Sequence, residues 1–235
     1  MKVGTDGVLL GAWAELPPAF DVDRVRPLLL DVGAGTGLIS LMLAQRFPSA
    51  EISAVEIDGE SACECSDNFA RSPWHGRMSV VNSDFLTAEF CGGFNLIVSN
   101  PPFFANGAKA PDEARHAARH EDALPLAALI ERGARLLEPD CGALALVLPS
   151  ERADEAEFAA ELSHLHLWRK TILTTVPGKA PRRVLLQFLN RAGGVDECDD
   201  CASENPIISN ECLSTSSGSR TSWHRELVKD FYLNP

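Results

Sequence analysis

The sequence predicts an α/β protein built on a doubly wound, mainly parallel sheet. Apolar runs of strand length alternate with segments of helical periodicity from residue 28 onward. A glycine-rich turn joins the first strand of this series to its first helix, as expected of a parallel βα unit. The last two long strands are separated by Pro177-Gly178, which predicts a hairpin that adds an antiparallel edge to the sheet.

The elements alternate in chain order. Apolar, strand-sized runs predict buried strands at 28–32, 51–56, 78–82, 94–99 and 142–148. Apolar residues at helical spacing predict helices at 37–47, 60–70, 124–137 and 154–164. The hairpin strands are expected near 167–175 and 183–190. A loop is expected near 214–222, where serine is frequent, and a short helix at 223–231.

The length of 235 residues fits one domain, with 45% hydrophobic and 23% charged residues as in an ordinary soluble globule. We expect a core over 28–190, an N-terminal segment over 1–27 and a C-terminal extension over 191–235. No apolar run approaches the roughly 18–20 residues of a membrane helix. Residues 1–13 lack the apolar core of a secretory signal.

Charge is unevenly distributed along the chain. Lysine and arginine minus aspartate and glutamate gives 21 − 33 = −12, which argues against indiscriminate nucleic-acid binding. Residues 195–212 carry six acids and no base. Residues 164–195 carry no acid and six bases, namely Arg169, Lys170, Lys179, Arg182, Arg183 and Arg191. A specific basic patch on an acidic protein therefore stays open.

Seven cysteines, an odd number without an export signal, predict reduced thiols and a cytoplasmic protein. Cys198-x-x-Cys201 could form a zinc site with Cys212 and His224. No second cysteine pair follows, so we expect no metal.

The loop Asp31-Val32-Gly33-Ala34-Gly35-Thr36-Gly37 ends the first strand and opens the first helix of the core. Its glycines allow a sharp turn and close approach to a ligand, and the helix start offers free N–H groups. A dinucleotide fingerprint would need glycine at Leu38. The Gly-x-Gly-x-Gly spacing after an aspartate instead resembles the first motif of S-adenosylmethionine-dependent methyltransferases.

Acids follow the next two strands. Glu56 is placed to accept hydrogen bonds from two ribose hydroxyls. Asp84 is placed to accept one from an adenine amino group, and Asp58 is expected to cap the next helix. Together with Asp31 they predict a ligand site at the carboxyl ends of the strands.

The fourth strand ends in Asn100-Pro101-Pro102-Phe103. The two prolines remove N–H donors, so the Asn100 side-chain oxygen and the Pro101 carbonyl remain as acceptors. They can bind the two hydrogens of an amino group on a π-system, while Phe103 stacks on the planar substrate. The tetrad predicts methylation of a planar nitrogen, with adenine N6, guanine N2 and glutamine amide all open.

The segment from Lys2 to Ala14, with Gly4-Thr5-Asp6-Gly7 at its centre, closely resembles the tRNA1(Val) adenine-N6 methyltransferases. Ser72-Pro73-Trp74, Arg183-Val184-Leu185-Leu186 and Lys229-Asp230-Phe231-Tyr232-Leu233 agree with that family too. The resemblance implies a Rossmann-like class I methyltransferase with a seven-stranded sheet. It also implies methylation of adenosine 37 beside the anticodon of valine tRNA.

The resemblance also implies the site residues. Asn100, Pro101, Pro102 and Phe103 would hold the adenine. The cofactor would lie against Thr5, Asp6, Asp31, Gly33, Gly35, Gly37, Glu56, Asp84 and Asn100. The family usually has tyrosine at Phe103. It also has a further segment before the stretch matching Met1, so we expect a truncated or misannotated start.

Two other functions share these motifs. A protein glutamine N5-methyltransferase would use the same tetrad, and a non-catalytic RNA-binding protein could keep the fold. For the tRNA reading, Lys179, Arg182 and Arg183 are the expected phosphate contacts, because they cluster at the hairpin tip. The alternative for these bases is that they keep an edge hairpin from pairing with another sheet.

Overall fold

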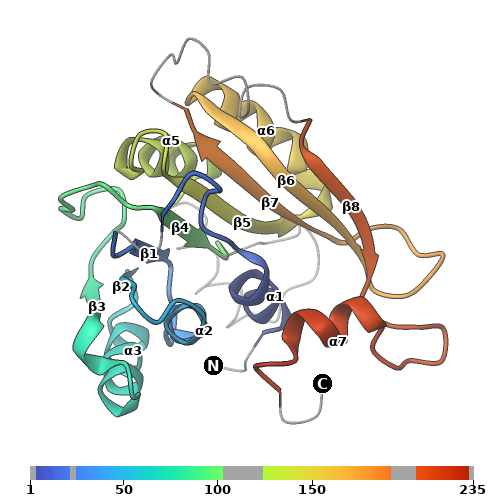
Figure 1. Cartoon of the computed structure of the whole chain (residues 1–235), viewed down its shortest axis with the longest axis horizontal. Helices are drawn as coiled ribbons and strands as arrows, with labels where there is room; N and C mark the ends of the chain where they lie inside the picture. The colour runs from blue at the N-terminus through green and yellow to red at the C-terminus, as the bar shows by residue number, and fades with distance from the viewer. Residues whose placement is uncertain (1–3, 22–24, 103–123, 192–204, 233–235) are drawn as a thin grey trace, which may run out of the picture.

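One mixed sheet forms the centre of the molecule (Figure 1). The computed structural model describes residues 4–21, 25–102, 124–191 and 205–232. Within them, eight strands pair in the order β3-β2-β1-β4-β5-β7-β6-β8. The strands are β1 Leu28–Val32, β2 Glu51–Glu56, β3 Met78–Asn82, β4 Leu96–Ser99, β5 Ala143–Pro149, β6 Leu165–Thr174, β7 Arg183–Asn190 and β8 Ile207–Cys212.

Most of the helices lie in connections between these strands; in the described residues one helix precedes the first strand and one follows the last. The α-helices are α1 Thr5–Trp13, α2 Leu38–Arg46, α3 Gly59–Arg71, α5 Leu126–Leu136, α6 Ala153–Leu162 and α7 Ser222–Val228. Two short 3-10 turns, His75–Arg77 and Ser150–Arg152, are also present in the described ranges. Each helix predicted from periodicity is present within about two residues of its expected ends, as is usual for such boundaries.

The sheet is parallel apart from one strand. β7 runs antiparallel to β5 and β6, whereas the β1–β2, β1–β4, β2–β3, β4–β5 and β6–β8 pairs are parallel. The predicted α/β class, with its mainly parallel sheet and its antiparallel C-terminal pair, is confirmed.

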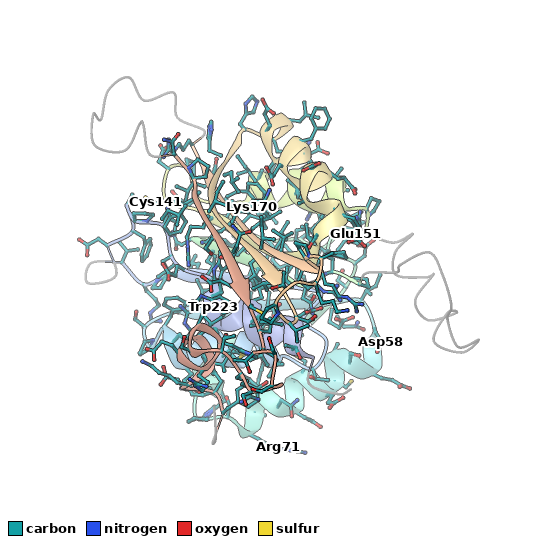
Figure 2. All side chains as sticks on the ribbon, turned by 90° about the vertical axis from the view of Figure 1, so that its right-hand side faces the viewer. Asp58, Arg71, Cys141, Glu151, Lys170 and Trp223 are labelled. Carbon is teal, nitrogen blue, oxygen red and sulfur yellow. The ribbon has the colours of Figure 1, made fainter. Side chains whose placement is uncertain are left out.

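Two details of the prediction are wrong. The sheet has eight strands where seven were expected, because Ile207–Cys212 joins it beside β6. The β6–β7 hairpin is consequently not the edge of the sheet. β7 lies between β5 and β6, and β8 covers the far side of β6. Figure 2 views the molecule from the side of this added strand, with Lys170 on β6 and Trp223 on α7.

Helices cover both faces of the sheet. One core packs α5 and α6 against the strands through Leu129, Ile130 and Ala156. The opposite face carries α1 and α2, with Leu9 and Leu43 fully buried there. The near-continuous burial of β4 and β5 is typical of strands covered on both faces. This three-layer arrangement presents the strand ends, and the loops that follow them, at one edge.

Candidate active site

The strand order reverses between β1 and β4, so the carboxyl ends of these two strands are the expected ligand crevice of this fold class. The chain proceeds from β1 outward to β2 and β3, then returns to the other side of β1 as β4 and β5. Open α/β sheets bind ligands where the order reverses in this way. Val32 and Ser99 are paired in register, and Ser99 Oγ donates a 2.8 Å hydrogen bond to the Val32 carbonyl. The glycine loop and the Asn-Pro-Pro segment therefore leave the sheet side by side.

The glycine loop has a backbone that glycine alone adopts readily. Gly33, Gly35 and Gly37 have φ values of +71°, +56° and +83°. The N–H groups of Gly33 and Ala34 both donate to the Val55 carbonyl, at 2.9 and 3.2 Å. A Cβ at Gly37 would lie 2.6 Å from the Phe69 ring, whereas one at Gly33 would meet no atom within 4 Å. The loop thus packs tightly at its helix end and stays open at its strand end.

Glu56 ends β2 with its carboxylate turned to the loop. Its Oε2 accepts the Gly35 N–H at 2.7 Å, and its Oε1 accepts the Asp58 N–H at 2.9 Å. The side chain is only 8% exposed. Asp58 itself caps α3 by accepting from Ser61 N–H at 2.9 Å, as its sequence position predicted. Glu56 therefore orders the glycine loop through Oε2 and holds the Asp58 backbone through Oε1.

Asp31 lies fully buried beneath the loop. Its Oδ2 accepts from the Ser40 N–H at 3.0 Å and from Ser40 Oγ at 2.7 Å, so it fixes the first turn of α2. Its Oδ1 has no hydrogen-bond partner in the part of the chain that the structure describes. Burial raises the pKa of the Asp31 carboxyl to about 6, against the opposing effect of the Ser40 hydrogen bonds.

Asp84 follows β3 at the same edge of the sheet. Its Oδ1 accepts the Leu86 N–H at 2.8 Å, which fixes the turn after the strand. The side chain is half-buried. Asn82 ties this strand end to β2 by donating to the Glu56 carbonyl at 2.8 Å. The three predicted acids Asp31, Glu56 and Asp84 thus come from three neighbouring strands.

Asn100 and Pro101 follow directly on β4. Asn100 is partly exposed and Pro101 is buried. No hydrogen bond to the Asn100 side chain is found among the described residues. Pro102 is exposed, and Phe103 lies outside the described residues. The acceptors predicted for an amino group therefore stand next to the glycine loop.

The N-terminal helix α1 runs alongside α2 in the same direction. A Cβ at Gly7 would lie 3.6 Å from Ile39, and one at Gly11 would lie 2.9 Å from Met42 Sδ. Because α2 begins at the glycine loop, α1 begins beside it too. This brings Thr5 and Asp6 to the crevice, where Arg183 Nε donates to Asp6 Oδ2 at 2.8 Å. The sequence analysis assigned Asp6 to the cofactor and Arg183 to RNA, but it did not predict the ion pair between them.

The basic hairpin tip reaches the same edge. β7 runs antiparallel to both β5 and β6, so β6 runs in the same direction as β5. The turn after Thr174, at the end of β6, therefore projects from the edge where the parallel strands have their carboxyl ends. Lys179 and Arg182 are exposed there, and Arg183 is half-buried in its pair with Asp6. Cys198 and Cys201 lie outside the described residues.

Comparison with known proteins gives the family. The sequence model of the methyltransferase small domain matches residues 19–171. A tRNA1(Val) (adenine(37)-N6)-methyltransferase of Phocaeicola vulgatus is 40% identical over the whole chain and 92% of its own length. The chain belongs to this methyltransferase family. The homologue of the same name from Bacteroides thetaiotaomicron is 44% identical over 84% of the chain and 81% of its own length.

A solved structure supports the fold of this family. A predicted O-methyltransferase from Agrobacterium tumefaciens superposes with a TM-score of 0.67 over 95% of both chains, at 16% identity. That likeness carries the class I methyltransferase fold alone. The family membership rests on the sequence relatives, which cover α1, the glycine loop and the Asn-Pro-Pro segment together.

Proposed function

We propose that this chain transfers a methyl group from S-adenosylmethionine to N6 of adenosine 37 in tRNA1(Val). The observation that carries the proposal is the Val32–Ser99 register, which sets the glycine loop beside Asn100 and Pro101. The names of the relatives supply the nucleoside and the tRNA. The tetrad alone leaves the choice among amino groups open.

The residues at the crevice fit the cofactor. Open space at Gly33 leaves room for a ligand against the backbone, and the buried Glu56 carboxylate suits ribose hydroxyls. The unpartnered Oδ1 of Asp31 suits a cationic group nearby. When bound, S-adenosylmethionine supplies an electrophilic methyl group. Thr5, Asp6, Gly35, Gly37 and Asp84 complete the proposed cofactor site.

Asn100 and Pro101 would prepare the attacking nitrogen. The Asn100 side-chain oxygen and the Pro101 carbonyl accept the two hydrogens of the adenine amino group. This arrangement lets the nitrogen turn its lone pair out of the ring, toward the methyl group. No strong base is required, because the methylated nitrogen carries a positive charge and loses its proton readily. The rate would come mainly from alignment of the reacting atoms. Stacking by Phe103 remains part of this proposal.

Lys179 and Arg182 are the proposed phosphate contacts. Both are exposed on a turn at the edge where the adenine would enter. An anticodon-loop base swings out more easily than one inside a helix, so local basic contacts suffice to present it. A tRNA substrate agrees with a cytoplasmic protein. None of the helices in the described ranges is long and apolar enough to cross a membrane.

The proposal is tested by incubating the protein with S-adenosylmethionine and total tRNA from a strain that lacks the enzyme. Nucleoside mass spectrometry should show N6-methyladenosine, and a tRNA1(Val) transcript carrying guanosine at position 37 should stay unmodified. A parallel reaction offers release factors. Methylation of their glutamine with unmodified tRNA would replace the proposal by the protein methyltransferase. Retention of tRNA without methyl transfer would replace it by the RNA-binding protein.

A further inference from the structure

The ion pair between Arg183 and Asp6 joins the start of β7 to the first turn of α1 at the crevice. Arg183 Nε donates to Asp6 Oδ2 at 2.8 Å, and Arg183 Nη1 donates to the Arg182 carbonyl at 3.0 Å. The side chains of Arg183 and Asp6 are 35% and 27% exposed. Lys179 and Arg182, in contrast, are exposed and make no such ion pair among the described residues. Arg183 is therefore already engaged within the protein, unlike the exposed bases of the hairpin.

The two ends of α1 are held very differently. At the C-terminal end, Trp13 Nε1 donates to Thr171 Oγ1 at 3.0 Å, and Arg46 donates to the carbonyls of Gly11 and Ala14 at 2.9 and 2.5 Å. Arg169 adds a donor to the Trp13 carbonyl at 3.2 Å. This end is thus locked to α2 and to β6 by several hydrogen bonds.

Within the described residues, the N-terminal end of α1 has fewer such anchors. Its N-cap is Gly4, which has no side chain to accept from the first N–H groups. Across the described residues, the polar side-chain contact at this turn is the Asp6–Arg183 pair. The first turn is also the part of α1 that lies beside the glycine loop, as the contact of Gly7 with Ile39 requires.

Arg183 is well placed to act as this anchor. It is the first residue of β7, and it pairs in register with Pro149 of β5 and Leu173 of β6. Its backbone therefore belongs to the interior of the sheet, at the carboxyl edge of β5. An arginine fixed at that position can hold the first turn of α1 in place relative to the sheet, through its bond to Asp6.

We propose that Arg183 is a positioning residue for the cofactor site, which holds Asp6 and the first turn of α1 against the glycine loop. This inference rests on the proposed cofactor site. The positive charge of Arg183 also balances the Asp6 carboxylate, so the N-terminus of α1 keeps its attraction for a negatively charged group. Arg183 would then govern cofactor affinity, although sequence reasoning assigned it to RNA.

The test is calorimetric titration of S-adenosylmethionine without RNA, on the parent, Arg183→Gln, Arg183→Lys and Asp6→Asn, and on the double variant. We expect Arg183→Gln to weaken binding about tenfold, because small misplacements in a site are costly. Arg183→Lys should recover part of the loss. In kinetics with saturating tRNA, KM for the cofactor should rise while kcat changes little. The melting temperature should change little, because the other end of α1 stays anchored.

Arg26→Gln is the matched control. Arg26 forms an ion pair with Glu51 at the opposite edge of the sheet, and its loss removes the same charge. This variant should bind the cofactor like the parent. In the double-mutant cycle, the variant with both Arg183→Gln and Asp6→Asn should bind the cofactor no more weakly than the weaker single variant. Each single substitution already removes the Arg183–Asp6 interaction.

Parental cofactor affinity in Arg183→Gln would overturn the inference, as would losses that add in the double variant. Parental affinity for the cofactor with a flatter salt dependence of tRNA binding would return Arg183 to the RNA contact. If Arg183→Gln fails to fold, Arg183→Lys decides, because it keeps the charge and should still bind the cofactor more weakly than the parent. A parent that binds the cofactor but methylates no adenosine would refute the proposed function and leave this test intact.

Discussion

The backbone N–H of Gly35 and Oε2 of Glu56 form a 2.7 Å hydrogen bond, so the glycine loop after β1 is held by the acid that ends β2. Glu56 also accepts from Asp58 N–H, which places both carboxylate oxygens on backbone donors. A residue proposed to bind ribose thus shapes the loop that lies against the same ligand. The proposed ribose contact and the order of the loop therefore depend on the same side chain.

Glu56→Ala should weaken S-adenosylmethionine binding by about 1–3 kcal/mol, because ribose hydroxyls and the Gly35 N–H both lose an acceptor. Calorimetric titration at neutral pH measures this directly. Glu60→Ala, at an exposed acid in the first turn of α3, is the control and should leave the affinity unchanged. Unaltered affinity in Glu56→Ala would exclude the ribose assignment.

Alanine at two glycines should separate folding from binding. Gly37→Ala adds a Cβ 2.6 Å from the Phe69 ring and 2.8 Å from Cys65 Sγ, so it should lower the melting temperature markedly. Gly33→Ala meets no protein atom within 4 Å, so its folding cost should be about 1–2 kcal/mol, from the positive φ alone. It should nevertheless abolish most cofactor affinity, because the new methyl group enters the proposed site. Thermal unfolding and calorimetry together measure both effects. The reverse pattern would place the cofactor elsewhere.

Asn100→Ala should lower turnover by about two to four orders of magnitude, in the range found when a group acting on the transition state is removed. The cofactor should still bind, because the glycine loop and Glu56 are intact. Single-turnover methylation of tRNA, combined with a cofactor titration, distinguishes the two steps. If the variant instead loses its cofactor, Asn100 belongs to the cofactor site and not to the adenine site.

The sequence predicted the central strands because each is an apolar run buried on both faces. β8 escaped prediction because an edge strand needs no apolar alternation. It pairs with β6 through its backbone, and its side chains, Asn210 and Glu211 among them, stay largely outside the core. The apolar run Val184-Leu185-Leu186 indicates an interior position for β7, and this strand is buried from Val184 to Phe188. Arg169 and Lys170 give no such indication for β6, although β6 is interior too.

The site could be predicted only as far as single residues following single strands. Glu56 ends β2, Asp84 follows β3 and Asn100 follows β4, so parallel pairing brings them to one edge. The Asp6–Arg183 pair could not be predicted in that way, since its residues are 177 positions apart and meet only through the strand order. The hydrogen bonds of Asp31 to Ser40 likewise depend on how α2 packs over β1.

Changing Lys179 and Arg182 together to glutamine should weaken tRNA binding. Each phosphate contact that the variant loses means that fewer counterions are released on binding. The slope of log affinity against log salt should therefore flatten by about 1.5 in total. Arg26→Gln with Arg135→Gln is the matched control. It removes the same charge from an opposite edge of the sheet and from the surface of α5. Filter binding at several salt concentrations gives both slopes. Equal slopes for the two double variants would show that RNA binds away from the hairpin tip.

Asp31→Asn should change the pH dependence of stability. Burial raises the pKa of Asp31 from 3.8 to about 6, so the native state keeps a proton that the unfolded chain releases near pH 4. The stability that Asp31 contributes through this proton is fully present below the pKa of the unfolded chain, and it is lost as the pH rises through 6. The shift of about two pH units corresponds to about 3 kcal/mol. Asparagine carries no such proton. The free energy of unfolding of the variant, relative to the parent, should therefore rise by about that amount between pH 4 and pH 8. Urea unfolding across this range measures the difference, and a constant difference would show that Asp31 titrates alike in both states.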